Sequence, residues 1–189
     1  MDGTVPANLR LRLRSATREA HEALDAQVSA FEISTESGLR SFLAMQVQAL
    51  SALMPVSGRA GCAPILEPLR DRARDDLAAL SGRVPESAPV LEAAPHPLAL
   101  DYVIAGSRLG TVILKQRWKA STDPAVLAAG NYFGAPDYIA CWKDFCTSAA
   151  EMDASCAISD RIVADVAGLF DFYRRCAQSA VSCERERHV

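Results

Sequence analysis

Apolar residues recur at spacings of three and four along most of this chain, the pattern of helices that bury one face. The pattern is clearest from about residue 7 to residue 30, where it predicts one long amphipathic helix with arginine and glutamate on its outer side. No segment alternates between apolar and polar residues for long enough to predict a strand. The spacing therefore predicts an all-α fold.

Capping residues, glycines and prolines mark the ends of the other helices. We expect helices over residues 36–54, 65–80, 98–118, 123–129, 135–149 and 159–180. The segment 82–97 is rich in proline and is expected to be a connecting loop, and residues 181–189 are expected to form a frayed tail. A length of 189 residues suits a single domain, so we expect one helical bundle over residues 1–189.

The composition of the chain argues against two classes of function, nucleic-acid binding and membrane insertion. Half of the residues are hydrophobic, 23% are charged and the formal net charge is −3, which fits a folded protein and gives no basic footprint for nucleic acid. No apolar stretch reaches the length of a membrane span, and the N-terminus has no apolar signal core. We therefore predict a cytoplasmic protein that binds neither nucleic acid nor membrane.

The six cysteines are spread widely and form no CxxC motif. A chain of this size does not need disulfides to fold, and three of the cysteines lie within apolar helical patterns. Structural thiols are the favoured interpretation, and a metal or redox role is the less favoured one.

His21 is a candidate for binding a metal or a cofactor. It lies in the middle of the first predicted helix and on the same side as Leu24, so its ring is expected to point toward the apolar interior. Asp25 follows four residues later, within reach of the ring nitrogen that a ligand does not use. Arg14 lies two turns earlier on roughly the same face and could meet an anionic group of the ligand. An ordinary surface pair of His21 and Asp25 is the alternative.

The second unusual element is a helix with two internal glycines. Gly106 and Gly110 lie one turn apart on one face, and each costs about 1 kcal/mol relative to alanine. Close packing of two helix backbones would explain them. The close approach of a flat ligand would explain them equally. A histidine on one helix and bare backbone on another suit a planar cofactor between them, and haem with one protein ligand fits better than zinc, which needs three or four donors.

Two segments resemble the haem oxygenase family, in particular its short bacterial, biliverdin-producing type. Residues 9–25, with the run LRSATREAHEALD, are similar to the helix on the proximal side of the haem, and residues 102–114, with GSRLG, are similar to the glycine-containing helix on the distal side. Weaker similarity extends over the later aromatic residues, namely Tyr132, Phe133, Trp142, Phe145 and Phe170.

The resemblance implies a helical bundle that holds haem b between a proximal and a distal helix. His21 would be the iron ligand, Asp25 its hydrogen-bond partner and Arg14 a contact of a haem propionate. Thr17 and Tyr102, within the two matching segments, would also contact the cofactor.

On the distal side, Gly106, Ser107 and Gly110 would line the pocket in which the reaction occurs. The chain departs from the family pattern at Ala105, where relatives often have glutamate, and at Thr111, where a glycine is common. Ser107 stands in place of an aspartate, and Lys143 is a candidate for a second propionate contact.

The expected function is therefore that of a haem oxygenase, in which haem is both cofactor and substrate, dioxygen is the co-substrate, and the products are biliverdin, carbon monoxide and ferrous iron. Electrons would come from an external ferredoxin or reductase, because no flavin or nucleotide motif is present, and a bilin-using photoreceptor could receive the product. A non-catalytic haem-binding or sensor protein is the first alternative. A helical interaction module without a cofactor is the second.

Overall fold

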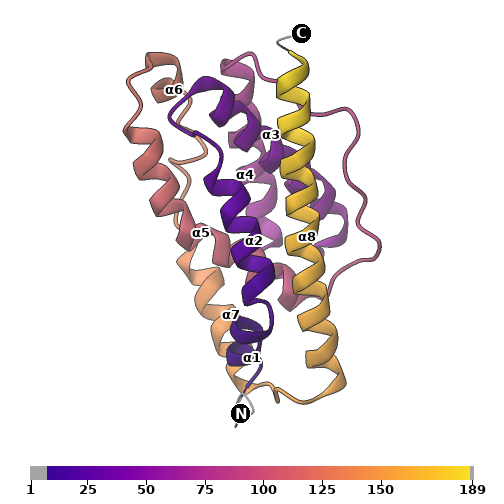
Figure 1. Cartoon of the computed structure of the whole chain (residues 1–189). Helices are drawn as coiled ribbons and strands as arrows, with labels where there is room; N and C mark the ends of the chain where they lie inside the picture. Colours follow the sequence, from indigo (N-terminus) through magenta and orange to yellow (C-terminus); the bar gives the residue numbers. More distant parts are fainter. Residues whose placement is uncertain (1–7, 188–189) are drawn as a thin grey trace.

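A computed structural model describes residues 8–187, and the regular structure in this range is helical (Figure 1). The all-α prediction is thus confirmed. In chain order the helices are α1 (Leu9–Ala16), α2 (Arg18–Ser29), α3 (Glu36–Leu53), the 3-10 helix η1 (Met54–Val56), α4 (Ala63–Ala79), α5 (Pro97–Lys119), α6 (Pro124–Ala128), α7 (Ile139–Glu151) and α8 (Ala157–Glu186).

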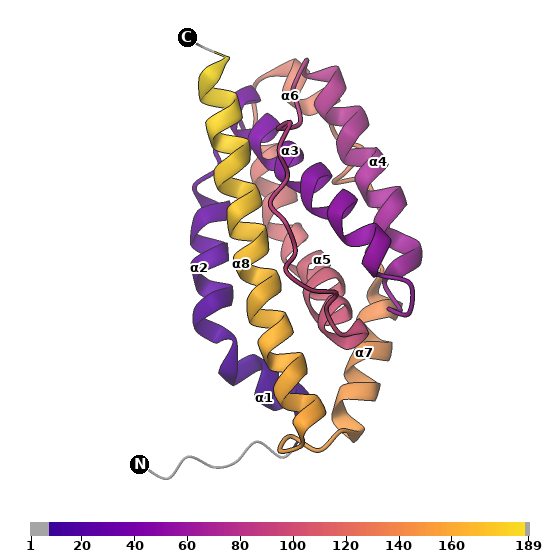
Figure 2. The same cartoon turned by 90° about the vertical axis from the view of Figure 1, so that its right-hand side faces the viewer.

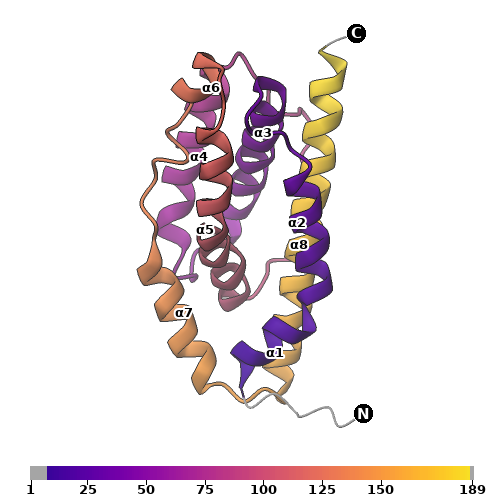
Figure 3. The same cartoon turned by 60° about the vertical axis from the view of Figure 1, so that its left-hand side comes forward.

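The core is built around α3, most of whose residues are buried, including Phe42, Leu43 and Leu50. On its two long sides α3 packs against α4 and α8. The long helix α8 also packs against α2 and α5, so it connects these two helices with the α3–α4 pair (Figures 1 and 3). Because α2 contributes no fully buried residue, it lies on the outside of the bundle, against α8.

The first predicted helix is interrupted at Thr17, which ends α1 and begins α2. The hydroxyl of Thr17 donates to the carbonyl of Leu13 at 2.7 Å, a back-bond that often bends helices. At its other end α1 is attached to the α7–α8 connection, since the amide of Leu9 donates to the carbonyl of Met152 at 3.1 Å. The prediction of one continuous helix was wrong, and its residue 7 lies outside the described range.

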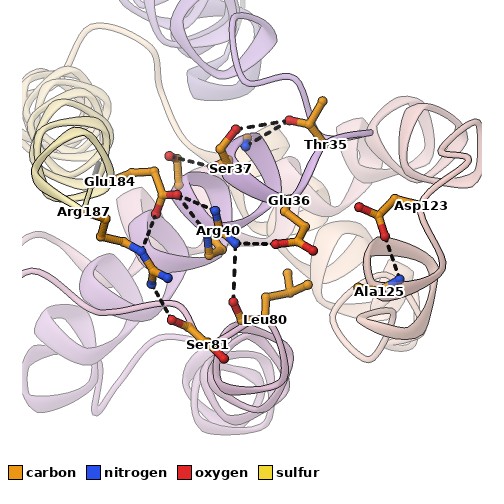
Figure 4. Close-up of polar contacts among 12 residues, drawn as sticks. Thr35, Glu36, Ser37, Arg40, Leu80, Ser81, Asp123, Ala125, Glu184 and Arg187 are labelled. Carbon is orange, nitrogen blue, oxygen red and sulfur yellow. Dashed lines mark hydrogen bonds and ion pairs between the residues drawn. The ribbon is translucent and has the colours of Figure 1, made fainter. Parts of the chain in front are cut away.

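The prediction of a frayed tail was also wrong for residues 181–187, because α8 continues to Glu186. Arg40 of α3 contacts Glu184 of α8 through Nε at 2.9 Å and Nη2 at 2.7 Å. Arg187 donates to the carbonyl of Ser81, at the end of α4 (Figure 4). These contacts hold the last turns of α8 against α3 and α4. Residues 188–189 lie outside the described range.

The proline-rich loop is present as predicted and runs along the outside of α3 from the end of α4 to the start of α5 (Figure 2). Ser81 adopts a left-handed conformation with φ of 53°, which ends α4 close to the predicted place. At the other end His96 caps α5, because its Nδ1 accepts a hydrogen bond from the amide of Leu98 at 3.2 Å. The amide of His96 in turn donates to Asp165 of α8 at 2.7 Å.

All six cysteines are free, and Cys62 and Cys176 are buried in the core. Burial raises the pKa of the Cys62 thiol, and it raises the pKa of Cys176 to about 12. These two thiols therefore stay protonated at neutral pH and pack as small apolar groups.

One described helix, α5, is long and apolar enough by composition to cross a membrane. Core helices of other proteins pass the same test, and in α5 Val103 and Ile104 are buried against the bundle. Three apolar side chains further along α5 are exposed, Leu109, Val112 and Ile113.

Candidate functional site

A cavity of about 490 Å³ lies between α2 and α5, a size that is typical of small-molecule sites. The two helices face each other with α3 behind them (Figure 3), and side chains from both line the cavity together with side chains from α3, α7, α8 and the segment before α7. The lining is mostly apolar and aromatic. It includes Leu24, Val28, Phe42, Met45, Tyr102, Val103, Leu109, Ile113, Leu114, Tyr132, Trp142, Phe170 and Tyr173.

Two polar contacts join the helices that border the cavity. Near the start of α2, Thr17 is hydrogen-bonded to the hydroxyl of Tyr102 on α5. Near its end, Nη1 of Arg117 on α5 donates to the carbonyl of Ser29 at 3.2 Å. The twelve-residue separation of Thr17 and Ser29 corresponds to about 18 Å along a helix. The part of the cavity between these two contacts, with α2 on one side and α5 on the other, is called the slot.

His21 lies on the α2 side of this slot. Its Nδ1 is 3.1 Å from Oδ2 of Asp25, as the spacing predicted, and this contact leaves Nε2 available to a ligand. The edge of the ring packs against Phe170, with ring centroids 5.3 Å apart. The side chain is 52% exposed, so it lines an open cavity and does not point into the closed apolar interior that we had expected.

The two glycines lie on the α5 side and have different neighbours. A Cβ added at Gly110 would meet no heavy atom within 4 Å outside its own turn of helix, among the residues that the structure describes. A Cβ at Gly106 would lie 3.2 Å from the ring of Trp142 on α7. Close packing of helix backbones therefore explains neither glycine. Gly110 leaves space in the cavity, and Gly106 makes room for an aromatic side chain that lines it.

The hydroxyls on this face of α5 donate to the helix backbone. Ser107 Oγ donates to the carbonyl of Ile104 at 2.8 Å, and Thr111 Oγ1 donates to the carbonyl of Ser107 at 3.1 Å. Both residues line the cavity, where their oxygens can still accept hydrogen bonds. Ala105 is buried and lies outside the lining.

The remaining predicted contacts lie at the edge of the cavity or away from it. Tyr102 lines the slot. The pKa of its hydroxyl is raised by burial, although the hydrogen bond with Thr17 and the charge of Arg14 act in the opposite direction. Arg14 and Thr17 are therefore near the Tyr102 end, although neither is part of the lining. Lys143 is exposed on α7 and does not line the cavity.

Several residues of the inner wall were not predicted from the sequence. This wall is the side of the cavity that α3, α8 and the segment around Tyr132 form between α2 and α5. Phe42 and Met45 come from α3, whose apolar pattern predicts burial without showing which side chains face a cavity. Arg108, which is buried and lies outside the lining, was also missed, because its burial depends on elements that are remote in the chain. Within residues 8–187, no group of three or more histidine, cysteine or acidic side chains is arranged to hold a metal ion.

Comparisons with protein-family models, with curated proteins and with solved structures gave no match to this chain. The resemblance to haem oxygenases therefore rests on the sequence segments quoted above alone.

Proposed function

We propose that the protein binds haem in the slot between α2 and α5 and cleaves it oxidatively, as a haem oxygenase. The observation that carries the proposal is the placement of His21 and Gly110 on opposite walls of one cavity. A histidine whose Nδ1 lies 3.1 Å from a carboxylate faces, across the slot, a helix turn on which a side chain is absent and space is left. These are the features that a planar cofactor with one protein ligand requires.

On the α2 side, Nε2 of His21 would hold the iron. Asp25 would fix the orientation and tautomer of the ring through Nδ1 and make the imidazole a stronger donor. The apolar side chains Leu24 and Val28, on the same face of α2, would lie against the macrocycle and exclude water. Arg14, near the Tyr102 end, would contact an acidic substituent of the ligand.

On the α5 side, the backbone of Gly106 and Gly110 would bound the space for dioxygen. When bound, haem supplies an iron centre that activates dioxygen, and the macrocycle is itself oxidised to biliverdin, with release of carbon monoxide and ferrous iron. Ser107 and Thr111 would accept hydrogen bonds from ordered water beside the reacting edge, since their own protons are donated to the backbone. Aromatic side chains such as Trp142 would shield the site from bulk solvent.

The proposed reaction needs electrons from another protein, a ferredoxin or a reductase. A bilin-using photoreceptor would be a suitable acceptor of the product. In this proposal the protein acts in the cytoplasm and needs no contact with membrane or nucleic acid.

A non-catalytic haem-binding or sensor protein is the second candidate, and one observation favours it. The two hydroxyls beside Gly110 donate to the carbonyls of Ile104 and Ser107, so neither presents a proton to the cavity in this conformation. Binding of haem would then occur without efficient proton delivery.

Haemin added to the purified protein separates these functions. A Soret band of bound haem supports both candidates, and its absence contradicts both. Ascorbate or a ferredoxin with its reductase is then supplied under air. Conversion of the Soret band into the broad red absorption of biliverdin supports the oxygenase, whereas a stable band supports the sensor.

A further inference from the structure

A buried cation lies directly behind the inner wall of the cavity. Arg108 of α5 is 5% exposed, and its Nε and Nη1 atoms are buried without a hydrogen-bond partner. None of the ion pairs formed among residues 8–187 includes this guanidinium.

The other buried arginine of the fold shows what such a group ordinarily requires. Arg40 has two carboxylates, with Nη1 at 2.6 Å from Glu36 and Nη2 at 2.7 Å from Glu184. A buried charge without an opposite charge is strongly unfavourable in proteins. The positive charge of Arg108 is thus uncompensated by the fold and would be stabilised by an anion from outside the chain.

Arg108 is connected to the cavity through Tyr132. Its guanidinium carbon lies 5.2 Å from the centroid of the Tyr132 ring, and Tyr132 lines the cavity. Burial raises the pKa of the Tyr132 hydroxyl, while the charge of Arg108 and its hydrogen bond to that hydroxyl lower it. The carboxylate that contacts the Tyr132 segment, Asp76, accepts from N–H groups of Asn131 and Tyr132 at 2.8–3.0 Å and forms no ion pair with Arg108.

The guanidinium of Arg108 lies against the ring of Tyr132, and its positive charge makes the phenolic O–H a stronger hydrogen-bond donor. A guanidinium has donors and no acceptor, so it cannot itself accept this proton, which can be donated to another group. Tyr173 lines the same inner wall, and its pKa is raised by burial and by the neighbouring Tyr132. Tyr132 and Tyr173, together with Gln46 of α3, are the polar residues of an inner wall whose other side chains are apolar.

We propose that the inner wall of the cavity is a binding subsite for an anionic oxygen of the ligand, with Tyr132 as the hydrogen-bond donor and Arg108 as the residue that positions and charges it. The ligand class is an aromatic or macrocyclic molecule that carries an anionic oxygen. This deepens the proposed function of the same cavity, because haem offers such an oxygen in two ways, as a peripheral carboxylate or as an anion on the iron. The subsite itself depends on the geometry of the cavity and can be tested without haem.

The first test compares two fluorescent probes that differ in charge, anilinonaphthalene sulfonate and its uncharged parent phenylnaphthylamine. Each is titrated into wild-type protein, Tyr132→Phe, Arg108→Met and Arg108→Lys. We expect the wild type to prefer the sulfonate, and we expect that preference to fall by about tenfold in Tyr132→Phe and Arg108→Met. Arg108→Lys should retain part of the preference because it keeps the charge.

Controls separate this role from a structural one. Arg70→Met removes an arginine of α4 that pairs with Glu67 and Asp71 and does not line the cavity, so it should leave the preference unchanged. Since Arg108 acts through the hydroxyl, Arg108→Met should have a smaller effect in the Tyr132→Phe background than in wild type. Should Arg108→Met fail to fold, Tyr132→Phe decides the question, because it retains the ring. An unchanged probe preference in Tyr132→Phe would overturn the proposal.

The second test identifies the source of the anionic oxygen in haem. Haemin and haemin dimethyl ester are titrated into wild type and Tyr132→Phe, and fluoride is titrated into each haemin complex. Discrimination against the ester that is lost in Tyr132→Phe assigns the subsite to a carboxylate, whereas weaker fluoride binding in Tyr132→Phe assigns it to an anion on the iron. If both quantities are equal in the two proteins, haem does not use the subsite and its assignment to the proposed function is overturned. If wild type retains the probe preference without binding haemin, the proposed function fails and the anion subsite stands.

Discussion

Arg40 of α3 and Glu184 of α8 form a nearly buried ion pair, with Nη2 at 2.7 Å from Oε1 and side-chain exposures of 9% and 11%. The two residues are separated by 144 positions in the chain. The pair explains why the end of α8 remains helical and packed. Arg40 also contacts Glu36 and the carbonyl of Leu80, so one guanidinium joins α3, α4 and α8 (Figure 4).

Glu184→Ala should therefore destabilise the protein. The variant leaves Arg40 with Glu36 as its remaining carboxylate, so the expected loss is that of hydrogen bonds to a charged group, about 1.5–3 kcal/mol. Urea unfolding followed by circular dichroism measures this loss. Glu186→Ala, at an exposed position two residues further along α8, is the matched control and should change stability little. Equal stability of the two variants would show that the pair does not stabilise the end of α8.

A second prediction concerns the cap of α5. The pKa of His96 is lowered, mainly by burial and further by the charge of Arg161, although Asp165 and Asp101 act in the opposite direction. A histidine whose pKa is lower in the folded state stabilises the fold above its unfolded pKa of about 6.5, and that contribution is lost as the pH falls through this value toward the folded pKa. The neutral ring is also the form whose Nδ1 can accept from Leu98.

His96→Asn retains a capping acceptor without a titrating group. Between about pH 7.5 and pH 5.5, wild type should lose more stability in urea unfolding than His96→Asn does. The other two histidines are present in both proteins, so the difference reports on His96. A loss that is equal in the two proteins would contradict a role for this cap in the pH dependence.

Features of this protein that depend on local geometry could be predicted from its sequence, whereas features that depend on distant contacts could not. Helix spacing predicted the bundle, and an i to i+4 spacing predicted the contact of His21 with Asp25, since both are local geometry. The break at Thr17 was missed because threonine fits a helical pattern and its bend depends on a hydrogen bond to Leu13. Burial of Arg108 depends on elements that are remote in the chain, which no local pattern reveals.

A third prediction tests the proximal pair. His21→Ala should abolish the spectrum of histidine-bound haem, and added imidazole should restore it, because the side chain lines the slot and leaves space for a small ligand. His96→Ala is the matched control and should leave the spectrum unchanged, since His96 caps α5 outside the cavity. Loss of the spectrum in His96→Ala alone would show that the iron ligand was assigned to the wrong histidine.

Asp25→Asn should retain haem while weakening the iron–histidine bond. Partners of this kind typically change affinity or activity by about 10-fold to 100-fold when they are replaced. Resonance Raman spectroscopy of the ferrous protein measures the iron–histidine stretch, which we expect at lower frequency in the variant. An unchanged stretch would mean that the contact at 3.1 Å is an ordinary surface pair.

The last prediction uses the different surroundings of the two glycines. Leucine at Gly110 would extend into open space, so Gly110→Leu should block the cavity and impair haem binding or bilin formation. The protein without haem should be as stable as wild type or more stable, by about 0.5–1 kcal/mol, because leucine has the higher helix propensity. Gly106→Leu should instead lower the stability by about 1–3 kcal/mol, since its Cβ would already lie 3.2 Å from Trp142 and the rest of the side chain would overpack the wall. Thermal unfolding of the two variants without haem therefore shifts Tm in opposite directions, and a large decrease for Gly110→Leu with unaltered haem binding would show that this glycine serves packing and does not face the ligand.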